Sequence, residues 1–439
     1  MLVVMRAALE RYFEFDRLGT NWKTEILAGC TTFVTMAYII FVNPSILAEA
    51  GMPFAAVMTA TCLAAALGSL LMGGLARYPI ALAPGMGLNA YFTYTVVRGM
   101  GVPWEVALGA VFVSGVAFLV LTMAGIRQLI VGAIPTELYS AVAVGIGLFI
   151  ALIGFRNSGL VVTSNATMVG MGSLGNPHTQ LALFGLLLTA ALLAWHVRAA
   201  MLIGVLGTTA AGILAGLVQW RPQTFDVAEL GRTAMHLNLA GTLKLGLVEI
   251  VFVFLFVDMF DNIGTLVGVG KKAGLFNEAN RIPRINQILL SDATATIGGS
   301  LLGTSTVVSY IESAAGVVAG GRSGVTAIVT GLLFIAALFV APAIGAIPPS
   351  ATAPALILVG ALMISHSSEI HWKDPVVAIP AFLTITTIPL TFSIANGLAF
   401  GFTAHTLLRV LRGQYRQVTW LVYLLTALFL ARFIYLARG

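Results

Sequence analysis

Apolar residues occur along this chain in long runs that short polar segments separate. Many runs are about 17–25 residues long, the length that an α-helix needs to cross the hydrocarbon core of a bilayer. The predicted fold class is therefore an all-α polytopic membrane protein. Fourteen transmembrane spans are expected, over residues 25–47, 54–76, 80–98, 105–124, 136–155, 179–197, 200–219, 242–268, 284–302, 304–320, 325–343, 351–366, 375–391 and 394–411.

The two ends of the chain fall outside these spans. Residues 1–24 read as a short amphipathic cytoplasmic segment, since they lack the apolar core and the small-residue cleavage site of a secretory signal. Residues 418–436 form a further apolar helix that carries Arg432 within it. Two placements are open for this helix, an extra span and a position along the membrane interface; we expect the second.

The composition leaves little room for a soluble domain. Of the 439 residues, 59% are hydrophobic and 9% are charged, whereas a soluble globular protein carries about 25% charged residues. The net charge of +6 comes mainly from Lys and Arg in the loops that this topology places inside. The positive-inside rule then predicts a multi-pass protein of the cell (inner) membrane with a cytoplasmic N-terminus, and no nucleic-acid partner is needed to explain the charge. Cys30 and Cys62 have no paired-ligand spacing, so we expect packing roles, with no cofactor and no metal.

The two halves of the chain resemble each other at an offset near 220 residues. TFVTMAYIIFVNP at 32–44 aligns with VFVFLFVDMFDNI at 251–263, and APGMGLNAYF at 83–92 aligns with GTSTVVSYIE at 303–312. A repeat of seven spans has an odd number of crossings, so its second copy must be inverted in the membrane. Inverted repeats with interrupted helices at matching positions mark the binding site of secondary transporters. The predicted interruptions are residues 78–89 in the third span and 298–309 in the tenth.

Three acids stand inside the predicted spans rather than at their ends: Asp258, Asp261 and Glu312. An ionisable group at a helix centre costs about 2.5–3.5 kcal/mol on insertion scales, which makes it a candidate functional residue. Asp258 and Asp261 share a helix face that Thr265 extends by a turn. Glu312 follows the second interruption, and Asn89 takes the matching place in the first. Carboxylates and an amide around a cavity suit a small, flat, polar ligand with donors and acceptors on its edges.

Each of these residues also has a purely structural interpretation. The carboxylates can be polar contacts between helices, and Asn89 can be a capping or packing residue. Asp292 is interpreted as a supporting acid, and no specific role is expected for His366 or His371. Close acids also favour protonation, which suits proton coupling. We assign proton coupling to Glu312, Asp258 and Asp261, and substrate binding to Asp258, Glu312, Asn89, Asp261, Thr265 and Ser309.

Three motifs resemble the nucleobase–ascorbate transporter family, and within it the branch of AzgA-like hypoxanthine–adenine–guanine permeases. They are VFVFLFVDMFDNIGTLVGV at 251–269, APGMGLNAYF at 83–92 and GTSTVVSYIESAAGV at 303–317, and the N-terminal stretch 13–47 matches the same branch. The resemblance implies two inverted seven-span repeats, with core-domain spans in 25–124 and 242–343 and gate-domain spans in 136–219 and 351–411. It also implies proton symport of purines and homodimers through the gate domains.

The same resemblance implies roles for individual residues. Asp258 matches the eighth-span acid that binds the base, Glu312 the tenth-span glutamate and Asn89 the third-span asparagine. Asp261 matches a second eighth-span acid that affects affinity or conformational change. A different alignment, with uracil permeases, places DNIGTL at 261–266 on their E-x-I-G-x-L motif and makes Asp261 the main ligand. Which of the two aspartates binds the base is therefore open.

The function predicted from the sequence is a proton-coupled symporter that imports purine nucleobases such as hypoxanthine, adenine and guanine, and not an enzyme. Alternatives are a transporter of xanthine or uracil, and an anion transporter of the sulfate-permease type. The acids argue against the anion transporter, because its helix ends would favour basic or neutral groups. The D-x-x-D spacing of Asp258 and Asp261 is also found in intramembrane prenyltransferases, but these need a second Asp-rich cluster, which is missing from the sequence.

Overall fold

The computed structural model describes residues 2–125, 134–220, 226–242, 248–273, 282–345 and 347–436. The first half of the chain forms α1 (Leu2–Tyr12), α2 (Phe15–Leu18), α3 (Trp22–Met36), α4 (Ile39–Ala48), α5 (Phe54–Leu71), η1 (Met72–Ala76), β1 (Leu82–Pro84), α6 (Met86–Ala90), η2 (Tyr91–Gly99), α7 (Trp104–Met123), α9 (Thr136–Asn157), β2 (Val161–Ser164), β3 (Met168–Met171), α10 (Pro177–Ala194) and α11 (Ala200–Leu214). The second half forms α12 (Val227–Leu230), α13 (Leu239–Thr242), α14 (Val248–Ala273), α15 (Ile285–Leu302), β4 (Val307–Ser309), α16 (Ser313–Val318), α17 (Gly324–Ile344), α18 (Pro349–Met363), η4 (Ile364–Glu369), α19 (Pro375–Thr391), α20 (Ile394–Leu411), η5 (Tyr415–Gln417) and α21 (Trp420–Leu436).

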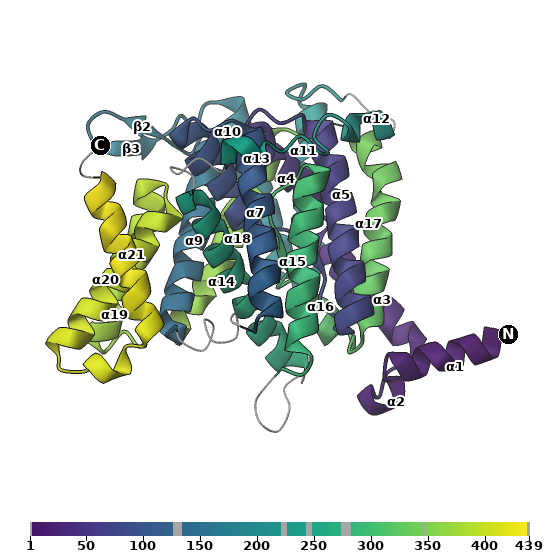
Figure 1. Ribbon diagram of the computed structural model, residues 1–439. Coiled ribbons are helices and arrows are strands. Elements are labelled where there is room, and N and C mark those ends of the chain that lie inside the picture. The colour runs from purple at the N-terminus through teal and green to yellow at the C-terminus, as the bar shows by residue number, and fades with distance from the viewer. Residues whose placement is uncertain are drawn as a thin grey trace.

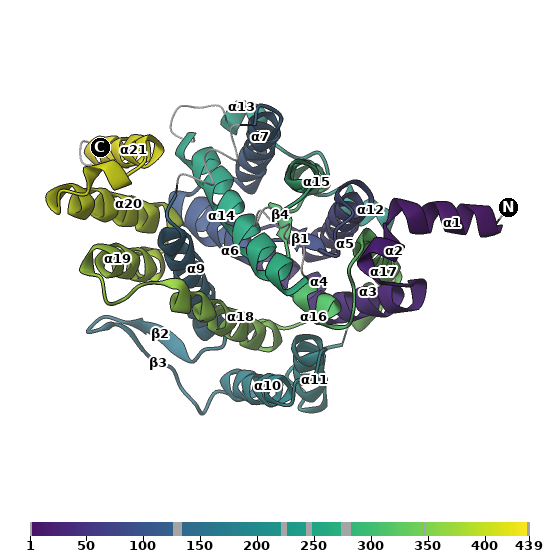
Figure 2. The same ribbon diagram turned by 90° about the horizontal axis from the view of Figure 1, so that it is seen from below.

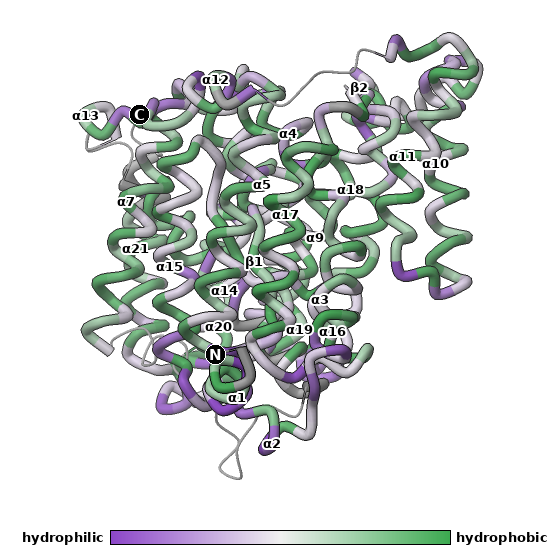
Figure 3. The backbone as a smooth tube through the Cα atoms, turned by 90° about the vertical axis from the view of Figure 1, so that its right-hand side faces the viewer, coloured by the Kyte–Doolittle hydropathy of each residue, from purple (hydrophilic) through white to green (hydrophobic). Residues whose placement is uncertain are grey.

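Every range that the sequence predicts as a span contains helical residues, although the predicted start of the eighth span includes 243–247, which lie outside the described residues. Seven of the described helices are long and apolar enough to cross a membrane: Trp22–Ala48, Phe54–Ala76, Trp104–Met123, Thr136–Asn157, Pro177–Ala194, Gly324–Pro342 and Pro349–Glu369. Figure 3 shows hydrophobic residues along the helices and hydrophilic residues gathered mainly at the two ends of the bundle. The chain is thus a multi-span helical membrane protein.

The helices form two groups, which Figure 2 shows side by side from below. We call α3 to α7 and α14 to α17, with β1 and β4, the core helices, after the domain predicted for these ranges. We call α9 to α11 and α18 to α20 the gate helices. α18 packs on α9 within the gate, and α17 packs on α3 and α5 within the core. The end of the bundle that carries α1 and α2 is its lower end in Figure 1, and α12 and α13 lie at its upper end.

A two-stranded antiparallel sheet lies inside the core helices. β1 comes from the first half of the chain and β4 from the second, with Leu82 opposite Ser309 and Pro84 opposite Val307. Each strand continues into a short helix, β1 into α6 and β4 into α16. Both predicted interruptions thus contain a strand, and a short helix begins within the first interruption and just after the second. Irregular backbone at this depth is tolerated because protein groups satisfy its N–H and C=O groups.

Two hydroxyl groups hold the strands in matching ways. Ser69 of α5 donates through Oγ to the carbonyl of Leu82 (3.1 Å) and accepts from the same residue's N–H (3.0 Å). Thr296 of α15 does the same for Val307 of β4, at 3.0 and 3.2 Å. Each strand is therefore fixed by the helix before it through both backbone groups of one residue. We call these two contacts the strand clamps.

The last three helices stand beside one another (Figure 1). Asp374 caps α19 by accepting from the N–H of Val376, and its carboxylate also pairs with Arg412 at the end of α20 (2.7 Å). These two contacts lower the pKa of Asp374. α21 runs antiparallel to α20, with the hydroxyls of Thr406 and Thr426 2.7 Å apart. Polar and aromatic contacts thus hold this helix alongside α20, and its placement relative to the membrane stays a prediction.

Candidate functional site

A cavity of about 120 Å³ lies where the strand ends of the core face the gate helices. Its lining comes from β1 and α6, from α14, from β4 and the turn after it, and from α9, α18 and η4 of the gate. The lining residues are Gly85, Met86, Gly87, Ile146, Ile150, Val257, Asp261, Thr265, Val308, Ser309, Tyr310, Ile311, Glu312, Val359, Leu362, Met363 and His366. Most of this lining is apolar, with a few polar groups placed together on the core side, the usual composition of a small-molecule site.

The core side of the cavity is built where α14 meets β4. Asp261 and Thr265, one helical turn apart, face the cavity from α14, and Ser309 and Glu312 face it from the end of β4 and the turn that follows. Asn262 holds the two elements together, because its Oδ1 accepts from the backbone N–H of Ser309 at 2.8 Å.

Gly85, between β1 and α6, keeps space open beside β4. A Cβ at this position would lie 2.9 Å from Cγ2 of Val308, closer than real Cβ atoms approach another group, and 3.7 Å from Oδ2 of Asp261. A side chain here would therefore displace Val308 or reduce the space beside the Asp261 carboxylate.

The polar side chains of Glu312 and Ser309 differ in their hydrogen bonding: the first has a partner and the second has none within the described residues. Oε1 of Glu312 accepts from the hydroxyl of Tyr38, which lies between α3 and α4, at 2.6 Å. Oγ of Ser309 is buried and has no hydrogen-bond partner within the described part of the chain. Buried polar atoms are nearly always paired, so the Ser309 hydroxyl is available for a ligand. Glu312, in contrast, is held in place by the hydrogen bond that it accepts from Tyr38.

Asp258 and Asn89 lie apart from the cavity lining. Asp258 is buried, and its Oδ1 accepts from Nδ2 of Asn262 at 2.9 Å. Since Asn262 in turn holds Ser309, Asp258 supports the strand rather than facing the cavity. Asn89 is buried in α6 and donates through Nδ2 to Oδ1 of Asn43 at 2.5 Å. The structure therefore brings together four of the six predicted binding residues: Asp261, Thr265, Ser309 and Glu312.

The gate wall of the cavity is apolar except at its lower edge. Ile146 and Ile150 of α9 and Val359, Leu362 and Met363 of α18 face the core, and His366 follows on η4. His366 is the one polar side chain that the described gate residues contribute to this lining. No role is predicted for His366 from the sequence, because a histidine beside a predicted loop has no spacing that connects it to Glu312 and Asp261, 54 and 105 positions earlier.

A smaller cavity of about 40 Å³ adjoins the first and extends toward the lower end. It shares Ile146, Asp261, Thr265, Met363 and His366 with the larger one, and adds Tyr139, Val142 and Ala143 from the lower part of α9. The smaller cavity therefore lies on the lower side of the larger one, and the two share the polar residues Asp261, Thr265 and His366.

Gly87 of α6 is a close contact between core and gate at the cavity lining. A Cβ built on Gly87 would lie 2.5 Å from Cγ2 of Ile146. The backbone of α6 therefore rests directly on α9, and any larger residue would push the two groups of helices apart.

As for metals, the described residues contain no group of three or more His, Cys, Asp or Glu side chains that could hold an ion.

A multi-span helical bundle with a small, polar-edged cavity between two helix groups is the architecture of a membrane transporter. Residues 23–400 match the model described as "Permease family", whose label is Xan_ur_permease. The chain belongs to this family, which confirms the family predicted from the motifs and makes the chain a permease rather than an enzyme.

Named proteins are similar to this one over nearly the whole chain. A protein of Methanocaldococcus jannaschii that carries the description "Putative permease" is 52% identical, covering 98% of this chain and 99% of its own length. A guanine/hypoxanthine permease of Bacillus subtilis is 44% identical (98% and 100% covered). An adenine permease of Escherichia coli is 41% identical (98% and 96% covered).

Solved structures share the fold at low sequence identity. The transmembrane domain of a cyanobacterium bicarbonate transporter, BicA, aligns with a TM-score of 0.63 at 13% identity, covering 85% of this chain and 96% of that one. The murine anion transporter Slc26a9 in its inward-facing state aligns with a TM-score of 0.65 at 13% identity, covering 90% and 69%. At this identity the likeness concerns the fold alone.

Proposed function

We propose that this chain is a proton-coupled symporter that imports purine nucleobases such as hypoxanthine, adenine and guanine. The observation that carries the proposal is the pair of carboxyl groups, Asp261 and Glu312, at the polar wall of one cavity between core and gate. Similarity over nearly the full length to an adenine permease and a guanine/hypoxanthine permease supports the choice of purines.

A purine fits this wall through its edges. Ring and exocyclic N–H groups donate to a carboxylate, while ring nitrogens and carbonyl oxygens accept from hydroxyl groups or from a protonated acid. Asp261 and Glu312 supply the acceptors, and Thr265 and Ser309 supply hydroxyl groups on the same wall. The apolar side chains of Ile146, Ile150 and Val359 cover the faces of the flat ring from the gate.

Asp261 is the better candidate of the two aspartates for binding the base. It lines both cavities, whereas Asp258 lines neither and accepts from Asn262. Asp258 then acts as a positioning residue, since Asn262 connects it to the backbone of Ser309. Asn89 supports the first half-helix through Asn43 in the same way.

In this proposal the movements of base and proton are coupled because both bind at the same site. A proton on Glu312 or Asp261 removes a buried negative charge, and base and proton then favour the same state of the carrier, which couples their movements. In this proposal the chain has fourteen spans in two inverted repeats, the lower end is cytoplasmic, and the core moves against the gate. His366, at the lower edge of the cavity, contacts the base as it leaves. A homodimer through the gate helices remains part of the proposal.

The test is uptake of labelled hypoxanthine by proteoliposomes that contain the purified protein, with and without an imposed inward proton gradient. Unlabelled adenine, guanine, xanthine, uracil and bicarbonate are added as competitors. We expect the proton gradient to drive accumulation, a sodium gradient of the same size to have no effect, and the three purines to compete. Competition by bicarbonate alone would favour the anion transporter, and competition by uracil alone would favour a pyrimidine carrier.

A further inference from the structure

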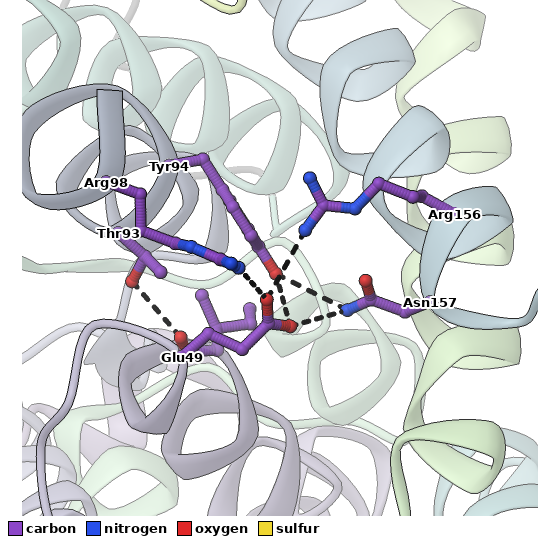
Figure 4. A network of polar contacts seen from close by, with 7 residues as sticks. Glu49, Thr93, Tyr94, Arg98, Arg156 and Asn157 are labelled. Atoms are coloured by element: carbon purple, nitrogen blue, oxygen red, sulfur yellow. Dashed lines mark hydrogen bonds and ion pairs between the residues drawn. The ribbon is translucent and has the colours of Figure 1, made fainter. Parts of the chain in front are cut away.

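A cluster of polar side chains connects core and gate near the upper end of the bundle (Figure 4). Glu49, at the end of α4, and Tyr94 and Arg98, on η2, belong to the core helices; Arg156 and Asn157, at the end of α9, belong to the gate helices. We call these five residues the upper cluster. The transport site described above does not use any of them.

Glu49 is the centre of the cluster. Its Oε1 accepts from the hydroxyl of Tyr94 and from Nδ2 of Asn157, both at 2.8 Å. Its Oε2 pairs with Arg98 at 2.7 Å and with Arg156 at 3.4 Å. One carboxylate therefore binds a guanidinium of the core and a guanidinium of the gate at the same time.

Further contacts cross between the two groups beside Glu49. The guanidinium of Arg156 lies over the ring of Tyr94, 5.1 Å from its centroid, and Nδ2 of Asn157 reaches the Tyr94 hydroxyl at 3.3 Å. On the same helix as Tyr94, Thr95 donates to the backbone carbonyl of Phe392, after α19, at 2.5 Å. At the lower end, in contrast, Nη1 of the gate residue Arg198 reaches Oγ1 of the core residue Thr31 at 3.5 Å.

We infer that the upper cluster is a latch that closes the upper end while the cavity is reached from the lower end, and that it separates in each transport cycle. The inference rests on the proposed function, because it requires the core to move against the gate. The latch is partly exposed, with 27% of the Glu49 side chain and 39% of the Arg156 side chain accessible. Partly exposed ion pairs are individually weak, which allows a contact of this kind to break and form again in every cycle.

The negative charge of Glu49 supplies the electrostatic attraction that holds core and gate together at the latch. Without it, Arg98 of the core and Arg156 of the gate would face each other as like charges, which repel. In Glu49→Gln the shape is kept and the amide oxygen can still accept from Tyr94 and Asn157. The loss of the negative charge should then shift the population toward a state that is open at the upper end. Removing the second guanidinium, in Glu49→Gln/Arg156→Gln, should reverse most of that shift.

The test measures access to the upper end directly. A reporter cysteine replaces Thr95, which lies on η2 and is buried against the turn after α19. Its hydroxyl is itself a contact across the two groups, so every variant, the parent included, carries this substitution in the same full-length background with Cys30→Ala and Cys62→Ala. The reporter is labelled with a membrane-impermeant maleimide from the upper side of right-side-out vesicles. The matched control is Glu229→Gln, which breaks an exposed pair with Arg232 at the upper end that joins no two helix groups.

We expect the labelling rate to rise about three- to tenfold in Glu49→Gln, a population shift in the range that a small ion-pair network can supply. The rate should return to within about twofold of the parent in the double variant and stay unchanged in Glu229→Gln. An unchanged rate in Glu49→Gln, or an increase that the double variant does not reverse, overturns the latch. Labelling needs no substrate, so a failure of purine uptake would count against the proposed function and leave this test valid.

Discussion

The two strand–helix units at the centre of the molecule share their backbone design but not their chemistry. β1 with α6 and β4 with α16 pair in one sheet, and each strand is held by a hydroxyl of the helix before it. Around β4, however, Asp261, Ser309 and Glu312 face the cavity. In the first unit the corresponding polar residue, Asn89, is buried against Asn43.

This difference shows how a repeated architecture can carry a single site. The backbone of both units must be satisfied inside the membrane, so both keep the same clamps. In the proposed mechanism only one unit needs groups that change charge, and an extra buried charge in the other would cost free energy without contributing a contact. Matching positions in the two halves are therefore evidence for matching structure, whereas function depends on where they differ.

The largest effect is expected for Glu312→Gln. The amide keeps the shape and can still accept from Tyr38, but it can neither carry a negative charge nor release a proton. Loss of a charged contact of this kind corresponds to a fall of about 100-fold in the initial rate of hypoxanthine uptake. Asn89→Ala in the first unit should change uptake by less than about tenfold. Equal losses in the two variants, at equal amounts of protein in the membrane, would contradict the assignment of the site to the second unit.

A smaller but still large effect is expected for Asp261→Asn. Because this carboxylate faces the cavity, its neutralisation should raise the KM for hypoxanthine about 30-fold. In Asp258→Asn, the new amide oxygen can still accept from Asn262, so KM should stay within about threefold of the parent. The reverse order of the two KM values would return the ligand role to Asp258.

The strand clamps provide a third comparison. Ser69→Ala and Thr296→Val each leave one buried N–H and one buried C=O without a partner, which costs about 1–3 kcal/mol per group. The midpoint temperature of thermal unfolding in detergent should therefore fall to a similar extent in both variants. Uptake should fall about tenfold more in Thr296→Val, because β4 carries Ser309 and leads to Glu312. Equal loss of uptake would mean that both strands position the base equally.

The smallest effect is expected on the gate wall, in His366→Gln. The gate contributes one polar side chain to the described lining, at its lower edge, so it contacts the base mainly as the base leaves. KM for uptake should rise about threefold, and efflux of preloaded hypoxanthine should slow by a larger factor. If uptake and efflux are affected equally, His366 contributes to the closed site rather than to the exit.

Much of this fold could be predicted from the sequence, because span length and broken helices follow from local composition. The choice between Asp258 and Asp261 could not. Residues three apart differ by about 60° around a helix, and only the contact of Asn262 with Ser309, 47 positions away, shows which side of α14 meets β4. His366 was missed for the same reason, since its proximity to Asp261 depends on how the gate packs on the core. The latch residues Glu49 and Arg156 lie in segments that a linear pattern describes only as span ends.

Gly87 has a consequence for any molecule designed to stop this protein. Where α6 rests on Ile146, one of the two facing surfaces is bare backbone, which offers no protruding side chain to interlock with α9. A contact of this kind lets the two groups of helices slide past each other while they stay in van der Waals contact. A compact apolar inhibitor wedged between Gly87 and Ile146 would hold core and gate fixed against each other, and because both residues line the cavity it would exclude the purine at the same time.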